Sequence, residues 1–178
     1  RLESLLGAVR RLNAQAYRAV ERELTDTLRE FAEVESAFQF DLLQHSVPSE
    51  LQVRFRIARV PIEQVRAAAL SRPFQGRLLR DWAAKMEADR MGYMRNAVRL
   101  GFVEGQTVSQ IVTRIRGTRA NKYADGVIAR SRRELETVVD TAVKHTAAVA
   151  RDRLLEANAD IVGAEPRKDV AVLKVEAP

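Results

Sequence analysis

Apolar residues recur at intervals of three and four through the first quarter of the chain. Between Leu2 and His45 there is no proline and a single glycine, Gly7. This spacing is typical of one face of an amphipathic helix. An unbroken helix of about 40 residues would extend about 60 Å at 1.5 Å per residue. The pattern predicts a long helical arm over residues 1–46 that needs a partner to cover its apolar stripe. The alternative is two antiparallel core helices with a break near Gly7 or Ser36.

A different pattern lies between Pro48 and Pro61. Four apolar residues alternate there with polar or small ones, namely Leu51, Val53, Phe55 and Ile57. Strict alternation with β-branched and aromatic residues is typical of a half-buried strand. The best mate for a strand over 51–57 is the run Val170, Val172 and Val175. We therefore predict a strand or linker over 47–60 and a C-terminal strand or tail over 163–178.

Helical patterns resume after this segment. A short helix is expected over 61–70, with Pro61 in its first turn. A second helical stripe over 79–100 is expected to end at Gly101. Gly92, inside that stripe, predicts close packing against another helix.

Capping signals mark the next two helices. Thr107–Gln110 has the form of a capping box, and Gly117 is expected to end the short helix that follows it. A polar connection over 118–126 ends in an Asp-Gly turn signal, and Ser131–Glu134 after it is a second candidate capping box. It predicts a helix of about 25 residues that Gly163 and a nearby proline end. The expected fold is mainly α, with a helical core over 61–162 and a small β element.

The composition of the chain limits the kinds of catalytic and metal sites that it can form. Cysteine is absent and the two histidines, His45 and His145, are far apart, so no disulfide, thiol catalysis or His/Cys metal site is expected. His145 lies beside the apolar face of its helix, which favours a core or interface role. The nearest carboxylate pair, Glu87 and Asp89, is expected to solvate its helix. We expect no enzyme and no cofactor, and no apolar run is long enough for a membrane span.

Positive charge is concentrated in the middle of the chain. Residues 47–135 carry 18 basic and 8 acidic side chains, whereas each flanking segment carries 6 basic and 8 acidic. Arginine supplies 25 of the 30 cations, and its fork binds phosphate or carboxylate in two places. A basic cluster of this kind can bind DNA phosphates without reading sequence. The candidate nucleic-acid residues are Arg114, Arg116, Arg119, Lys122, Arg130, Arg132 and Arg133. The alternative is a solvated face that pairs internally with Glu and Asp.

A series of motifs then follows in a definite order over roughly residues 61–162. They are Pro73-Phe74-x-Gly76 before a helix with Trp82, Gly101-x-x-x-Gly105-Gln106-Thr107 with Ile111 and Ile115, Arg130-Ser131-x-x-Glu134, and Glu156-Ala157-Asn158-Ala159-Asp160. In order and spacing these motifs resemble the phage head morphogenesis family, the minor head proteins similar to protein F of phage Mu. Members of that family continue past the long helix into a Trp-bearing strand, where this chain has Glu165-Pro166-Arg167 and soon stops. It also begins at Arg1 rather than Met, as expected of a processed or trimmed product.

The resemblance implies a role as a minor capsid protein of a tailed bacteriophage. Such a protein lies inside the head near the portal vertex, after assembly in the host cytoplasm, and aids genome packaging or ejection. The implied partners are the portal protein, other copies of the chain and packaged double-stranded DNA, with no membrane. The arm would then bind portal through Leu5, Leu12, Val20, Leu24, Leu28 and Phe31. The alternative function is a non-specific helical nucleic-acid-binding protein.

Overall fold

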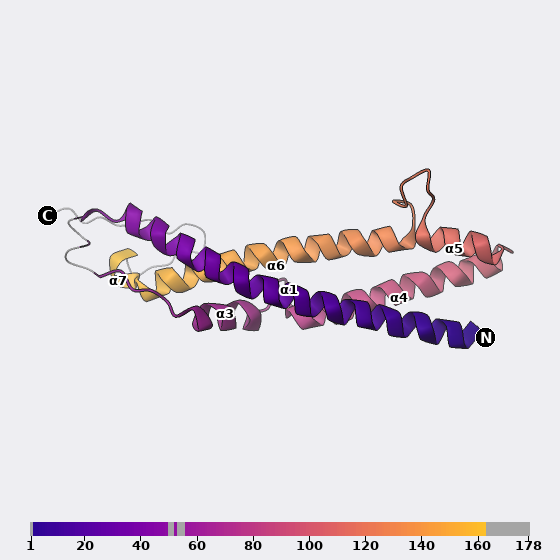
Figure 1. Ribbon diagram of the computed structural model, residues 1–178, viewed down its shortest axis with the longest axis horizontal. Helices are drawn as coiled ribbons and strands as arrows, with labels where there is room; N and C mark the ends of the chain where they lie inside the picture. Colours follow the sequence, from indigo (N-terminus) through magenta and orange to yellow (C-terminus); the bar gives the residue numbers. More distant parts are fainter. Residues whose placement is uncertain (1, 50–51, 53–55, 163–178) are drawn as a thin grey trace. The chain divides into compact units, whose positions relative to one another are not determined.

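The computed structural model describes residues 2–49, 52 and 56–162, with side chains for residues 7–49, 52 and 56–161. The fold is mainly helical (Figure 1). The helices are α1 (Leu2–Ser46), α3 (Ile62–Ser71), α4 (Leu79–Val103), α5 (Val108–Arg116), α6 (Val127–Ala157) and α7 (Ala159–Val162). Over the described ranges there is no strand, and the one β contact is an isolated antiparallel bridge between Phe74 and Arg77.

The first helix confirms the prediction from apolar periodicity. α1 runs without interruption through both Gly7 and Ser36, so the alternative of two helices with a break at either residue is wrong. Few of its interior residues are poor helix formers, and an amphipathic stripe over many turns stabilises one continuous helix once its apolar face is packed.

The structure does not show the predicted small β element. Gln52 is helical, and its backbone N–H donates to the carbonyl oxygen of Pro48 at 3.1 Å. Its side-chain amide donates to the carbonyl oxygens of Gln44 and Val47, both at 2.7 Å. Those carbonyls close the end of α1, so local capping outweighs the short alternation of apolar residues. The rest of 51–55 and all of 170–175 lie outside the described residues.

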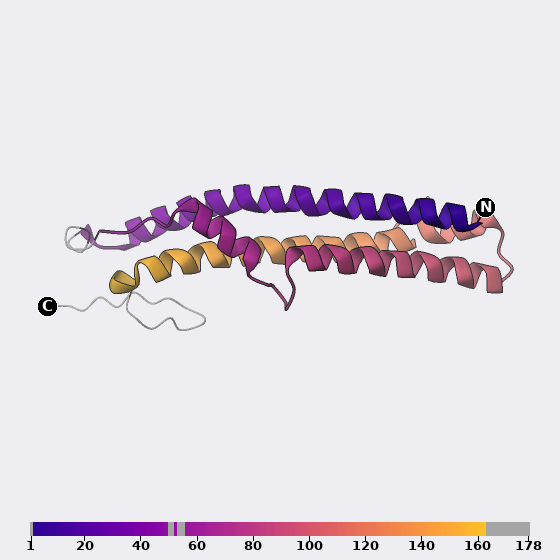
Figure 2. The ribbon, with the colours of Figure 1, turned by 90° about the horizontal axis from the view of Figure 1, so that it is seen from below.

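The chain forms two compact units, and α1 and α6 contribute to both. The first unit comprises residues 1–25 and 73–142. In it the first half of α1 lies along α4 (Figure 2), and the side-chain amide of Asn13 donates to the carbonyl oxygen of Glu87 at 3.2 Å. Tyr17 is buried there. The first residues of the chain are therefore part of a packed unit, in contrast to a free arm.

The second unit comprises residues 26–72 and 143–178. Its described core joins α1, α3 and α6 through Ala32, Val65 and Ala150, all almost fully buried. Asn158, between α6 and α7, closes one end of this unit. Its side chain accepts from the backbone N–H of Ala58 at 2.7 Å and donates to the carbonyl oxygen of Ala58 at 3.0 Å.

Two predicted features of α4 are corrected. Gly92 is exposed, and nothing lies within 4 Å of where its Cβ would be, so it does not mark a close helix contact. That contact is at Gly101, where a Cβ would lie 2.5 Å from Cγ1 of Ile111 in α5. Gly101 is thus inside α4, and the helix ends two residues later at Val103. A glycine buried in a helix allows two helices to approach closely.

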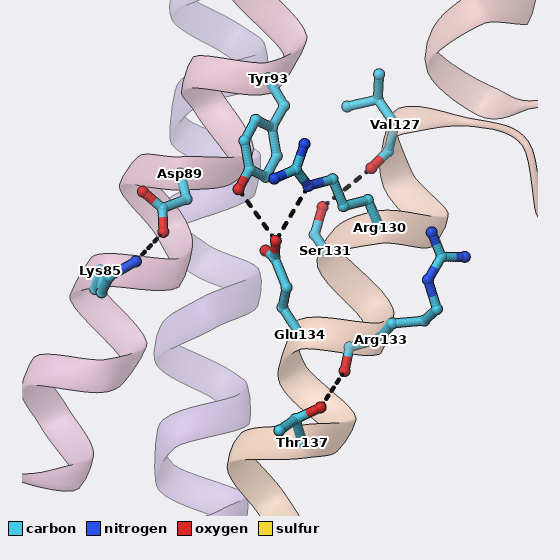
Figure 3. A network of polar contacts seen from close by, with 9 residues as sticks. All are labelled: Lys85, Asp89, Tyr93, Val127, Arg130, Ser131, Arg133, Glu134 and Thr137. Carbon is cyan, nitrogen blue, oxygen red and sulfur yellow. Dashed lines mark hydrogen bonds and ion pairs between the residues drawn. The ribbon is translucent and has the colours of Figure 1, made fainter. Parts of the chain in front are cut away.

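The boundaries of α5 and α6 differ in how well the capping signals predicted them. The capping box of Thr107 and Gln110 is present as predicted, and α5 ends before Gly117. The second box is wrong, because α6 already begins at Val127. Ser131 is buried inside the helix, where its hydroxyl donates to the carbonyl oxygen of Val127 at 3.3 Å (Figure 3).

None of the described helices combines the length and the apolar character that a membrane span requires.

Candidate functional site

The basic loop, residues 117–126, connects α5 to α6 and projects away from both helices (Figure 1). Its two ends touch at a pair of glycines. Gly117 has a positive φ of 93°, and a Cβ on Gly126 would lie 2.4 Å from the carbonyl carbon of Arg116. Only residues without a side chain allow the backbone to return so close to its starting point.

Asp125 holds the loop closed. Its Oδ1 accepts from the backbone N–H of Thr118 at 2.7 Å, and its Oδ2 accepts from the Thr118 hydroxyl at 2.7 Å and from the Asn121 amide at 2.9 Å. These donors stabilise the ionised form and lower the pKa of Asp125 to about 2. The negatively charged carboxylate of the loop therefore accepts hydrogen bonds from the loop itself, at its base.

Basic side chains occupy the tip and the two flanks of the loop. Arg119 and Lys122 are exposed at the tip, and Lys122 has a positive φ of 50°. From α5, the guanidinium of Arg116 lies 5.4 Å from the ring centroid of Tyr123. From α6, Arg133 donates to the carbonyl oxygen of Ala124 at 3.4 Å. None of these four cations has an ion pair among the described residues.

The other three predicted nucleic-acid residues are paired with carboxylates. Arg114 forms an ion pair with Glu104. Arg132 pairs with Glu136 at 3.0 Å. The structure thus divides the predicted set into four cations around the loop and three whose charge is balanced nearby.

Arg130 is the third of these paired cations and belongs to a small network (Figure 3). Its Nε lies 3.2 Å from Oε1 of Glu134, and its guanidinium lies 4.2 Å from the ring centroid of Tyr93. The Tyr93 hydroxyl donates to the same oxygen at 3.1 Å. Partial burial and the Glu134 carboxylate raise the pKa of Tyr93, so the phenol stays protonated as the donor. Arg133 points away from this network (Figure 3).

The sequence raised internal pairing with Glu and Asp as an alternative but did not identify the individual carboxylate partners of these arginines. Two of them follow their arginine by four residues on α6, at Arg130–Glu134 and Arg132–Glu136. That spacing places the two side chains next to each other on a helix, and could have revealed both pairs. No comparable signal points to Glu104, because its pairing with Arg114 depends on the turn between α4 and α5.

The predicted partner-binding residues of α1 are placed in different surroundings. Leu28 is only 4% exposed and belongs to the core of the second unit, so it is not available to a partner. Leu12 is 66% exposed. Val20, Leu24 and Phe31 are half-buried. The side chain of Leu5 lies outside the described residues.

Two further apolar surfaces are uncovered. The exposed ridge of α1 in the second unit consists of Val34, Phe38 and Leu42. In the first unit, a groove of about 420 Å³ lies between α1, α4 and α5. Its apolar lining includes Val9, Met94, Val98, Phe102, Ile111 and Val112. We refer to these surfaces as the exposed ridge and the apolar groove.

In the described parts of the chain, no three His, Asp or Glu side chains are placed to hold a metal ion. Asp89 forms an ion pair with Lys85 (Figure 3). His145 is half-buried in the second unit, and burial lowers its pKa.

The chain matches no protein-family model, no curated protein and no solved structure.

Proposed function

We propose that this chain is a minor capsid protein of a tailed bacteriophage, sited inside the head near the portal vertex. It binds portal protein and other copies of itself, contacts packaged DNA, and aids head assembly and genome packaging or ejection. The order of motifs in residues 61–162 suggests this function.

The observation that carries the proposal is the amount of apolar surface left uncovered. Phe102, Val103 and Val108 are strongly exposed at one end of the first unit, and the exposed ridge is uncovered in the second. Contiguous exposed apolar patches mark sites of protein interaction, because a soluble protein gains free energy by covering them. A role within a large assembly explains why a small chain leaves several such surfaces uncovered.

Portal binding is assigned to the accessible members of the predicted set on α1. Leu12 is the most exposed of those whose side chains are described. The test is co-sedimentation of the purified full chain with portal protein. Deleting residues 1–46 would be a poor test, because Tyr17 and Ala32 are core residues. Leu12→Glu leaves the core intact and should reduce binding about tenfold or more, the effect of losing one buried anchor.

The matched control for portal binding is Val103→Glu, which places the same charge on another exposed apolar position outside α1. It should bind portal as the unchanged chain does. Absence of portal binding by the unchanged chain would contradict the proposal, and equal binding by Leu12→Glu would remove the role of α1.

The second candidate function is a non-specific nucleic-acid-binding protein. The observation that favours it is the basic loop, which presents Arg119 and Lys122 with no ion pair in the described structure. Backbone phosphates need only such charges, without base contacts. The two functions differ in their partners: a chain that binds duplex DNA with no affinity for portal would favour this second function.

A further inference from the structure

The exposed ridge is a continuous apolar line on α1. Val34, Phe38 and Leu42 are spaced by four residues and are 66%, 57% and 51% exposed. Residues at this spacing lie one above the other on the same side of a helix. An amphipathic helix with such a line is the usual occupant of an apolar groove on a partner.

Acidic side chains border the ridge. Residues 30–46 contain four acidic residues and no Lys or Arg. Glu33 is neutralised by Arg66, at 2.6 Å. Glu30 and Asp41 are exposed, have no ion pair among the described residues, and lie within about 40° of Val34 around the helix axis. The ridge therefore presents an apolar line with uncompensated negative charge along one side.

The apolar groove has the opposite charge at its border. Arg10 and Arg95 line it, are exposed, and have no ion pair in the described ranges. Among the side chains that the structure describes, no acidic residue lines the groove. Met91 and Met94 form part of its wall, and methionine side chains adapt their shape to an incoming apolar surface. The groove is thus suited to an apolar helix with acidic flanks.

We infer that the exposed ridge of one copy binds in the apolar groove of a second copy. The chain itself carries both complementary surfaces, apolar against apolar and Glu30 and Asp41 against Arg10 and Arg95. Electrostatic complementarity of this kind selects the partner, and burial of the apolar side chains supplies the affinity.

The inferred contact joins two different surfaces. The ridge lies wholly in the second unit and the groove wholly in the first. A copy bound through its ridge therefore keeps a free groove, to which a third copy can bind. Contacts of this type produce rings or open chains, in contrast to the closed dimers of a two-fold interface.

The test measures molar mass by sedimentation equilibrium over a range of concentrations of the full chain. The unchanged protein should exceed the dimer mass as its concentration rises. Phe38→Glu on the ridge and Val112→Glu in the groove each place a charge on an exposed apolar position. Each variant alone should associate about 30-fold or more weakly, the effect of losing a central anchor.

A mixture of the two variants is the decisive measurement. Phe38→Glu retains an intact groove and Val112→Glu retains an intact ridge, so the mixture should form heterodimers and nothing larger. Leu100→Glu is the matched control, because Leu100 is an exposed apolar residue of α4 that belongs neither to the ridge nor to the residues that line the groove. It should associate as the unchanged chain does.

Three results would overturn the inference: an unchanged chain that stays monomeric, variants that associate normally, or a mixture without heterodimers. If the chain is monomeric, loss of portal binding by Val112→Glu in the separate co-sedimentation assay would assign the groove to portal. This inference rests on the proposed function in one respect only, the expectation that the chain associates with copies of itself. The experiment contains neither portal nor DNA, so portal binding can fail while self-association holds, and the reverse.

Discussion

At the scale of single residues, the glycines show that the sequence alone does not reveal how closely other atoms approach a residue. Gly92 and Gly126 both looked like structural glycines, one in a helix and one in an Asp-Gly turn. The structure places Gly92 in open surroundings and Gly126 against the backbone of Arg116. The turn could be predicted because its signal is local. The space around Gly92 could not, because it depends on residues distant in sequence.

Alanine at these two glycines should have opposite effects on stability. Gly126→Ala should lower the free energy of unfolding by about 2 kcal/mol or more, because its Cβ would meet backbone atoms of Arg116 and Gly117 at 2.4 Å. Gly92→Ala should raise it by up to about 1 kcal/mol, because alanine is the better helix former and meets nothing. Urea denaturation measures both, and a shared sign would contradict the structure.

Asp125 predicts a pH dependence of loop order. Its folded pKa of about 2 lies below the ordinary value of 3.8, so the ionised form is stabilised by folding. That contribution is fully present above about pH 3.8 and is lost as the pH falls through 2. Hydrogen exchange of the Thr118 amide, which donates to Asp125, measures the order of the loop. Protection should persist at pH 4 and decrease below pH 3.

Replacement of Asp125 provides the control for this titration. Asp125→Ala removes the acceptor of Thr118 and Asn121, so the Thr118 amide should exchange rapidly at every pH. Protection of that amide in the variant, or loss of protection near pH 6 in the unchanged chain, would contradict the role of the carboxylate.

At the scale of elements, two local signals gave the starts of helices correctly, and a third signal of the same kind did not. The Thr107–Gln110 box and Pro61 gave the starts of α5 and α3 correctly, because both act on adjacent backbone groups. Ser131–Glu134 had the same form but lies inside α6, which begins directly after Gly126. The strand expected at 51–57 was likewise not found at Gln52, which is helical.

The two candidate capping boxes predict different effects of the same kind of substitution. Thr107→Ala should destabilise the chain by about 1 kcal/mol, because the Thr107 hydroxyl accepts from the backbone N–H of Gln110. Ser131→Ala should change stability by less than about 0.5 kcal/mol, because its hydroxyl bonds a carbonyl already used in the helix. Thermal or urea unfolding compares them, and equal losses would indicate that Ser131 has a further role.

His145 predicts a loss of stability in mild acid. Burial lowers its folded pKa below 6.5, and the Arg72 backbone and the Asp152 charge oppose the effect of burial in part. The unfolded chain then binds the proton more readily, so stability is greatest above pH 6.5 and falls as the pH decreases through that value. The urea midpoint should decrease from pH 7.5 to 5.5, and His145→Gln should reduce that decrease. If His145→Gln shows the same decrease in urea midpoint as the unchanged chain, other titrating groups cause it.

At the scale of the molecule, the division into two units could not be read from the chain. Two of the three unit boundaries fall inside helices, between residues 25 and 26 of α1 and between 142 and 143 of α6, and the third lies between residues 72 and 73, just after α3. No composition shift marks such a boundary. Contacts such as that of Asn13 with Glu87, 74 positions apart, create it. The apolar stripe of α1 correctly predicted a need for cover, but the chain itself covers Leu28 and leaves the exposed ridge open.

The charge distribution of the molecule predicts which cations bind DNA. Arg119→Ala and Lys122→Ala should each reduce the slope of log affinity against log salt by about 1, because each removes one phosphate contact. Arg132→Ala should reduce it less, because that guanidinium already pairs with Glu136. Fluorescence anisotropy with two duplexes of unrelated sequence measures the slopes, and both duplexes should respond alike. If neither Arg119→Ala nor Lys122→Ala changes the slope, DNA is bound elsewhere on the chain. If the chain prefers one duplex, DNA is bound through its bases.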